Sequence, residues 1–346
     1  MVDEKATWFR GWLETSIGRV ACISTHMGLR DKLGGCRVRW GIWRMHYNVP
    51  AGLYAVGRPT AESPVLVTAN YKLSFDLLRR ELAGRDLWLL VLETFGINVW
   101  CAAGKGTFGT AELISRVQKV QLNKLVRHRT IILPQLGASG VAAHKVRKAT
   151  GFRVKYGPVR AHDLPSFLSN ALQASEENRR IRFTFRDRLV LTPVELVGAW
   201  KPSLVILLLV FIIGGLSGQA FSLQGALSRS LSPALIYLGA LLMGSFVTPL
   251  LLPWIPGRAF SLKGAQIGLL WAFTVSLTLA SAWSVGSIIA LFLIVPAIAA
   301  YFAMNFTGCS TFTSLSGVQK EMRIAVPVII LCIVSGGVAL MLDKFL

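Results

Sequence analysis

The chain has 346 residues, enough for two domains of ordinary size, and it carries 37 Lys and Arg against 17 Asp and Glu. Residues 1–201 hold +16 of the formal net charge of +20, whereas the strongly apolar residues 202–346 hold only +4. This division predicts a basic soluble part followed by a membrane part. Nucleic-acid binding is disfavoured, because neither basic recognition helices nor strand-borne aromatic signatures are found.

Cysteine usage and the N-terminal residues bear on the compartment. Charged residues interrupt the apolar ones near the N-terminus, so we expect no secretory signal. The five cysteines are scattered and form no C-x-x-C pair. That spacing argues against iron–sulfur and zinc sites within the chain and favours a reducing compartment.

Five apolar stretches follow one another in the C-terminal part. Most approach the ~20 residues that a helix needs to cross a bilayer. They cover residues 203–218, 233–252, 264–283, 285–304 and 324–342. Since these stretches contain almost no ionisable residues, they predict a membrane anchor of five helices more readily than a transport route.

Loop charge predicts how the five helices are oriented. With the N-terminus inside, four basic residues lie in cytoplasmic loops: Arg258, Lys263, Lys320 and Arg323. The outside loops then hold Arg229 and a turn near residue 281. We therefore expect a multi-pass protein of the cytoplasmic (inner) membrane, with the N-terminal domain in the cytoplasm and the C-terminus outside. The basic residues before residue 202 favour contact with anionic membrane lipid.

The soluble part alternates short apolar runs with amphipathic segments between residues 65 and 191, which predicts an α/β domain. Doubly wound, Rossmann-like folds with a mostly parallel sheet show this alternation. Expected strands cover 65–68, 87–92, 130–133, 152–156, 181–185 and 188–191; expected helices cover 74–82, 110–125, 139–148 and 164–171. The predicted organisation is a partly helical lead-in (1–64), a cytoplasmic ligand-binding domain (65–201) and an all-α membrane domain (202–346).

A glycine-rich segment follows the second predicted strand. A phosphate loop of the type G-x-x-x-x-G-K-[ST] fails there, because Val99 and Gly106 occupy positions that need Gly and Ser or Thr. Gly104, Gly106 and Gly109 fit G-x-G-x-x-G, but the acidic residue expected about 20 residues later is missing. Nicotinamide or flavin binding is therefore disfavoured, although these glycines still permit close approach of a large planar ligand.

Cys101, within this segment, admits three interpretations. A free cysteine is often a small buried hydrophobe. A catalytic nucleophile would need a base, and His128 and His144 are the candidates without a supporting local pattern. A soft thiolate ligand would suit a cobalt ion.

The residues around Cys101 resemble a known family. The run Asn98, Val99, Trp100, Cys101, Ala102, Ala103, Gly104, Lys105 matches the signature of the corrinoid proteins of microbial mercury methylation, the HgcA family. Residues 68–72, 133–137, 156–160 and 305–308 also resemble that family, and the resemblance covers about residues 28–342. The soluble domain is similar as well to the corrinoid iron–sulfur protein subunit of the acetyl-CoA pathway, which lacks the Cys101 motif.

The resemblance implies a cobalamin-type corrinoid, in its methylcobalamin form during turnover, with Cys101 as the lower axial cobalt ligand. The implied cofactor contacts are Cys101, Asn98, Val99, Trp100, Ala102, Gly104 and Lys105. Thr68 and Ser74 join them because Thr68 ends the first predicted strand and Ser74 starts the next predicted helix, at the rim where such sheets bind ligands. For Ser74, a role as the helix N-cap is an equal alternative. The implied activity is methyl transfer to Hg(II), giving methylmercury. A small ferredoxin-like protein with two [4Fe–4S] clusters would supply electrons, and a separate methyltransferase would supply the methyl group.

Two alternatives remain open from the sequence. One is a corrinoid methyl carrier of one-carbon or acetyl-CoA metabolism, and the Cys101 motif argues against it. The other is a membrane transport or assembly protein whose soluble head binds a ligand.

Overall fold

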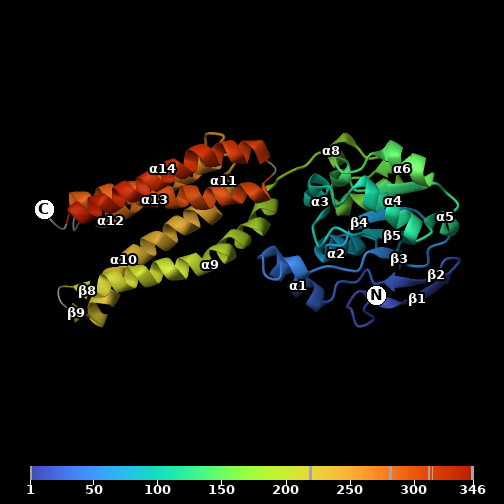
Figure 1. The fold of residues 1–346 in the computed structure, drawn as a ribbon, viewed down its shortest axis with the longest axis horizontal. Helices are drawn as coiled ribbons and strands as arrows, with labels where there is room; N and C mark the ends of the chain where they lie inside the picture. Colours follow the sequence, from blue (N-terminus) through green and yellow to red (C-terminus); the bar gives the residue numbers. More distant parts are fainter. Residues whose placement is uncertain (1, 218–219, 280–282, 311, 314, 344–346) are drawn as a thin grey trace. The chain divides into compact units, whose positions relative to one another are not determined.

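The computed structural model describes residues 2–343 apart from 218–219, 280–282, 311 and 314; of residues 217, 220, 279, 309 and 315 it describes the backbone alone. The chain divides into two compact units (Figure 1). Unit 1 contains residues 1–38 and 42–181, and unit 2 contains residues 39–41 and 182–346. The turn predicted near residue 281 lies outside the described residues.

Unit 1 is built on a seven-stranded mixed sheet in the order β1-β2-β3-β5-β4-β6-β7. Its parallel core consists of β5, β4, β6 and β7. The strands are β1 (Phe9–Thr15), β2 (Gly18–Ile23), β3 (Gly52–Val56), β4 (Val65–Ala69), β5 (Leu87–Leu92), β6 (Thr130–Leu133) and β7 (Arg153–Tyr156). The α/β class with a mostly parallel sheet is thereby confirmed, and β5 and β6 have the predicted bounds.

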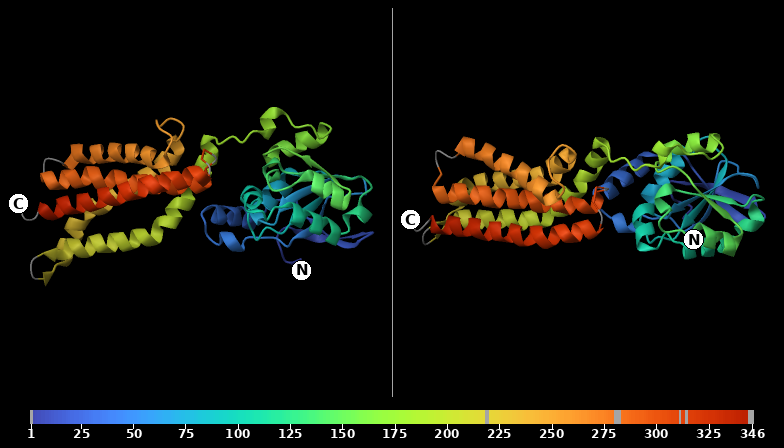
Figure 2. Two further views of the ribbon diagram at one scale, coloured as in Figure 1. Left: turned by 45° about the horizontal axis from the view of Figure 1, so that its top comes forward. Right: turned by 90° about the horizontal axis from the view of Figure 1, so that it is seen from above.

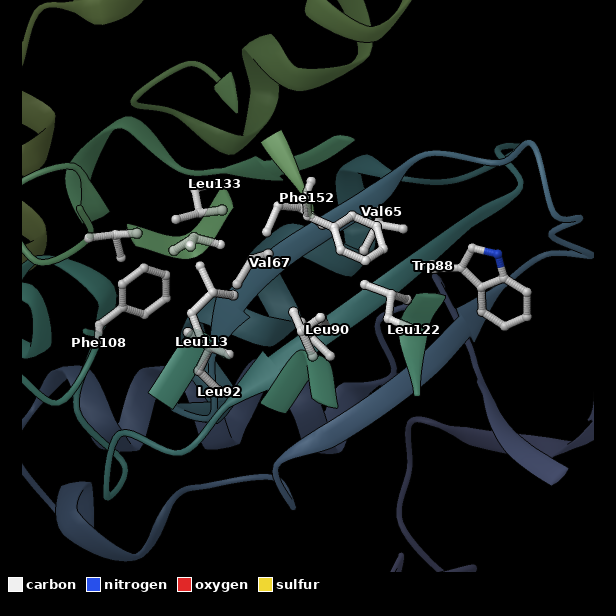
Figure 3. Packing of buried hydrophobic residues seen from close by; sticks show 14 of the residues in the cluster. Val65, Val67, Trp88, Leu90, Leu92, Phe108, Leu113, Leu122, Leu133 and Phe152 are labelled. Carbon is white, nitrogen blue, oxygen red and sulfur yellow. The ribbon is translucent and has the colours of Figure 1, made fainter. Parts of the chain in front are cut away.

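Helices cover both faces of this sheet, because successive side chains of a strand point to opposite faces. On β5, Trp88, Leu90 and Leu92 pack in one cluster with α4 (Thr110–Lys119), α5 (Leu122–Leu125) and α6 (Ala143–Thr150). Figure 3 shows these three residues with Leu113 of α4 and Leu122 of α5. The alternate residues Leu87, Leu89 and Val91 pack in a second cluster with α2 (Lys72–Glu81) and α7 (Leu164–Ser169). All six residues are almost wholly buried, as expected for a strand covered on both faces.

Residues 1–64 contribute more to the sheet than their sequence indicated. They supply β1, β2 and β3, together with α1 (Leu29–Arg39) and a short 3₁₀ turn, η1 (Arg44–His46). β2 lies parallel to β3, and β3 lies antiparallel to β5. The N-terminal strands therefore extend one edge of the parallel core.

Several predicted elements are corrected. The strands expected at 181–185 and 188–191 are wrong: a turn of helix, α8 (Glu176–Arg179), precedes them, and α9 (Phe185–Gly215) occupies most of that segment. A capping box formed by Thr184 and Asp187 starts α9 there. The helix predicted at 110–125 is broken between α4 and α5, where Gln121 adopts a left-handed conformation. The helix predicted at 139–148 begins later, at Ala143, after the 3₁₀ turn η2 (Gln135–Gly137).

Among its described residues, unit 2 contains five helices that are long and apolar enough to cross a membrane. They cover Phe185–Gly215, Leu223–Leu251, Phe260–Thr278, Val285–Gly308 and Ser316–Leu342, each overlapping one predicted stretch. A π-turn (Met243–Val247) joins α10 (Leu223–Leu242) to α11 (Thr248–Leu251), and a short hairpin of β8 (Leu216–Ser217) and β9 (Ala220–Phe221) follows α9. Four basic residues predicted for loops, Arg229, Lys263, Lys320 and Arg323, lie inside helices, because the helices extend beyond their apolar stretches.

Small residues let the helices of unit 2 approach one another closely. Figure 2 shows α12 (Phe260–Leu279), α13 (Val285–Asn305) and α14 (Leu315–Leu342) running side by side. A Cβ added at Gly264 or Gly268 of α12 would lie within 3 Å of α13 backbone atoms. Such packing of glycine and alanine against a facing backbone is typical of membrane helices.

Candidate functional site

A cavity of about 490 Å³ lies in unit 1 at the carboxyl ends of the parallel strands. β4 and β6 are neighbours in the sheet, but the chain continues from β4 to β5 on one side and from β6 to β7 on the other. Crevices at such a switch point are the usual ligand sites of open α/β sheets. The strand ends supply Thr68 on β4 and Leu133 on β6, and Gly157 directly follows β7.

Two further segments contribute to the cavity wall. α2 supplies Ser74, Leu77, Leu78, Arg80 and Glu81, and the loop after β7 supplies Pro158, Val159, Arg160, Ala161 and His162. Apolar side chains make up most of the wall, with two hydroxyl groups and a few charged groups among them. This composition suits a large, mainly apolar ligand whose edge carries polar groups.

A buried ion network fixes α2, which carries part of this wall. Arg79 donates to Asp76 (2.9 Å) and to Asp31 (2.8 Å), and Lys72 donates to the same two carboxylates. Burial alone would raise the pKa of Asp31, but hydrogen bonds from Thr7 and Lys72 and the charges of Lys72 and Arg79 lower it to about 2. Asp31 therefore stays ionised at neutral pH, and its bonds to Lys72 and Arg79 hold α2 against the first turn of α1.

The third wall element is the short helix α3 (Val99–Lys105), which carries the Cys101 motif. Asn98 is its N-cap residue, and its side-chain oxygen accepts a hydrogen bond from the Cys101 backbone nitrogen at 2.9 Å. Gly106 ends the helix in a left-handed conformation, with φ of 81°. This is a short helix with a specific start and stop.

One face of α3 packs into the core of unit 1. Val99, Ala102 and Ala103 are buried in the same cluster as Phe108 and Leu113. The opposite face, with Cys101, Gly104 and Lys105, is exposed, and Trp100 is 41% exposed. Residues three and four apart share a helix face. Burial of Val99, Ala102 and Ala103 on one face of α3 therefore leaves the thiol of Cys101 on the opposite, exposed face.

The cavity brings together five of the nine residues named from the sequence: Thr68, Ser74, Asn98, Val99 and Trp100. Cys101 contributes no atom to its wall and lies one residue beyond Trp100 on α3. Gly104 and Lys105 share its exposed face, whereas Ala102 is wholly buried in the core. α2 begins at Lys72 and Tyr71 holds its N-cap position, so Ser74 lies in the first turn of the helix and is not its N-cap.

The cavity residues of α2 other than Ser74, and those of the loop after β7, were not predicted from the sequence. Residues 156–160 were noted as part of the resemblance, without a role. Their position directly after the last parallel strand was the signal available, since every such strand end of this fold faces the same rim.

The fold and the cavity define unit 1 as a doubly wound α/β domain with a cavity at the carboxyl ends of its parallel strands. Residues 43–168, which include the cavity, match the model of the CO dehydrogenase/acetyl-CoA synthase delta subunit family. The similarity to a protein of the acetyl-CoA pathway, expected from the sequence, is therefore confirmed for this segment.

Individual relatives show a similarity of the same kind. The acetyl-CoA decarbonylase/synthase complex subunit gamma of Methanopyrus kandleri is 35% identical over 123 residues, which are 35% of this chain and 26% of that protein. The subunit gamma of Methanosarcina acetivorans is 32% identical over 129 residues, which are 36% of this chain and 27% of that protein. The chain thus spans about a quarter of the length of the curated relatives it matches.

Proposed function

We propose that unit 1 binds a corrinoid at the strand-end cavity and that the protein transfers a methyl group from it to Hg(II), with Cys101 as the lower axial ligand of cobalt. One observation carries the proposal. The helix whose first residues line the cavity presents an exposed soft thiol on its next residue. The similarity of residues 43–168 to acetyl-CoA pathway subunits supports a corrinoid as the ligand.

The residues present fit such a cofactor. A corrin is a broad planar ring with amide groups at its edge, and the cavity pairs apolar walls with the hydroxyls of Thr68 and Ser74. A Cβ added at Gly104 or Gly106 meets nothing within 4 Å, so the space beside the exposed face of α3 is open. A thiolate is a soft donor and therefore suits cobalt.

The bound corrinoid would supply a methyl group carried on its cobalt. The residues of the chain then act by position and by charge donation. Asn98 and the buried alanines of α3 hold the helix, and Cys101 would hold the cofactor through its sulfur and donate electron density to it, which would favour transfer of the methyl group as a carbanion equivalent. Hg(II), a thiophilic cation, is a suitable acceptor for such a group.

The membrane half fits the role of an anchor. We propose that the five helices hold unit 1 at the cytoplasmic face of the inner membrane with the C-terminus outside. The excess of basic residues at and near the helix ends on that side supports this orientation. Re-reduction of cobalt would come from a ferredoxin-like partner with two [4Fe–4S] clusters, and methyl groups from a separate methyltransferase.

The comparisons favour a second candidate, a corrinoid methyl carrier of acetyl-CoA metabolism. The test is to purify the full-length protein, measure cobalt and corrinoid absorbance, and offer Hg(II) to the protein loaded with a methylated corrinoid. Methylmercury formed in proportion to bound corrinoid supports mercury methylation. Stoichiometric corrinoid without methylmercury favours the carrier, and absence of cobalt favours a membrane protein with another ligand.

A further inference from the structure

Asn70, directly after β4, is a buried polar residue at the rim of the site, and only 2% of its surface is exposed. Its side-chain oxygen accepts hydrogen bonds from the backbone nitrogens of Thr94 and Gly96, each at 3.1 Å. The Thr94 hydroxyl lies 2.8 Å from the same oxygen, and the Asn70 amide group donates to Glu93 at 2.6 Å. A single side chain thus binds three residues of the loop between β5 and α3: Glu93, Thr94 and Gly96.

That loop has an unusual backbone. Phe95 and Gly96 both adopt positive φ angles, of 56° and 70°. The left-handed region is costly for phenylalanine, and such a conformation persists only where its surroundings impose it. Glu93 accepts a hydrogen bond from the Phe95 nitrogen at 2.9 Å, and the Asn70 amide in turn holds Glu93.

The loop leads directly into the N-cap of α3. The Thr94 hydroxyl also lies 2.7 Å from the Ile97 carbonyl oxygen, and the Ile97 nitrogen donates to the Thr94 carbonyl at 3.1 Å. Asn98 follows and caps the helix at the Cys101 nitrogen. A hydrogen-bonded path therefore runs from the end of β4 to the cysteine.

We infer that Asn70 is a positioning residue, which sets the place of α3, and with it Trp100 and Cys101, relative to the strand-end cavity. The inference rests on the proposed function for its consequence, because the position of the thiol then decides whether sulfur reaches cobalt. Asn70 itself is separate from the cavity wall. Its effect on the cofactor is transmitted by the loop at residues 94–97.

The first arm of the test uses the full-length protein without corrinoid and measures hydrogen exchange of the backbone amides. Asn70→Ala should accelerate exchange at residues 94–102 by about tenfold or more, because the backbone amides of Thr94 and Gly96 lose their acceptor. Ser63→Ala is the matched control. Ser63 is also buried and accepts a loop hydrogen bond, from Thr60 at 2.9 Å, but it lies before β4 at the other end of the strand. That variant should leave exchange at residues 94–102 unchanged.

The second arm loads each variant with cobalamin and measures cobalt–sulfur coordination by X-ray absorption. Asn70→Ala should lose most of this coordination, and Ser63→Ala should keep it. If Asn70→Ala does not accumulate as a folded protein, Thr94→Val decides by the same two measurements, since it removes only the hydroxyl group of the path. Unchanged exchange at residues 94–102, or equal acceleration in the control, overturns the inference. If wild type binds no corrinoid, the proposed function fails, while hydrogen exchange still decides the role of Asn70.

Discussion

The side-chain oxygen of Asn98 accepts a hydrogen bond from the backbone nitrogen of Cys101 at 2.9 Å, so one side chain both begins α3 and fixes the residue that bears the thiol. α3 has only seven residues, and short helices depend on their caps and on packing rather than on intrinsic propensity. The cap and the cysteine are therefore coupled by geometry.

Replacing Asn98 tests this coupling. Asn98→Ala should destabilise α3 by about 1 kcal/mol through loss of the cap, and should weaken cobalt–sulfur coordination in corrinoid-loaded protein. Asn98→Asp, which retains a capping oxygen, should preserve both. Hydrogen exchange at residues 99–105 reports the first effect and X-ray absorption the second. Equal behaviour of the alanine and aspartate variants would show that the cap has no such role.

The cavity hydroxyls give a second prediction. Thr68→Val combined with Ser74→Ala should weaken cobalamin binding by about fivefold to tenfold per lost hydrogen bond, because the hydroxyls of the wall are removed while its shape is nearly retained. Isothermal titration of the full-length protein measures the affinity. Thr150→Ala serves as control, since its hydroxyl bonds the Val146 carbonyl at 2.8 Å and lies away from the cavity. Unchanged affinity in the double variant would remove both hydroxyls from the site.

The ion network around Asp31 predicts an acid-sensitive stability. The pKa of Asp31 is lowered from 3.8 to about 2 in the folded protein, so its contribution is complete above about pH 4 and is lost as the pH falls through about 2. Asp31→Asn should destabilise unit 1 by about 3–5 kcal/mol at pH 7, because Arg79 loses a buried counter-charge. Thermal unfolding from pH 2 to 7 measures both effects. If the difference in the free energy of unfolding between wild type and Asp31→Asn is as large at pH 2 as at pH 7, this explanation is contradicted.

The division of the chain predicts where it can be cut. A chain ending at Ile181 retains all seven strands of the sheet in unit 1 and should fold as a soluble monomer. One ending at Trp200 retains about half of the continuous helix α9 and should aggregate more readily. Size-exclusion chromatography and thermal unfolding compare the two. If only the longer chain is soluble and folded, part of α9 is required by unit 1.

The sequence predicted the parallel core of unit 1 closely, because buried strands such as Leu87–Leu92 are continuous apolar runs between turn residues. It failed for residues 1–64, where β1 is only half-buried and α1 has no apolar face to give a period. It also failed at residues 181–191, where short apolar runs resemble strands. The capping box at Thr184 was the signal for a helix there.

The candidate site was predicted unevenly for a physical reason. Thr68 could be placed at the cavity because it ends a recognisable strand. Asn98 could be placed because it lies in the turn between a recognisable strand and the next helix. The hydrogen bonds from Asn70 to Thr94 and Gly96 could not be predicted, since they join residues 24 and 26 positions apart through two neighbouring strands. The burial of Ala102 also depends on tertiary packing, here against the core cluster that includes Phe108.

Cys101 itself gives the functional prediction. Cys101→Ala should abolish methylmercury formation. Membrane insertion and the folding of unit 1 should stay intact, because the side chain is exposed and the backbone nitrogen of residue 101 still donates its hydrogen bond to Asn98. Cys101→His should reduce the rate severely, since a neutral imidazole donates less charge than a thiolate. Methylation assays on membranes with matched protein content measure both. Wild-type rates in Cys101→Ala would exclude an essential role for the thiol.

The most direct test of the central claim is X-ray absorption at the cobalt edge of the full-length protein loaded with cobalamin, compared between wild type and Cys101→Ala. The proposal predicts a sulfur neighbour of cobalt in wild type and its replacement by a nitrogen or oxygen neighbour in Cys101→Ala, with similar amounts of bound cobalt. Identical spectra without a sulfur neighbour in both proteins would contradict the assignment of Cys101 as the axial ligand.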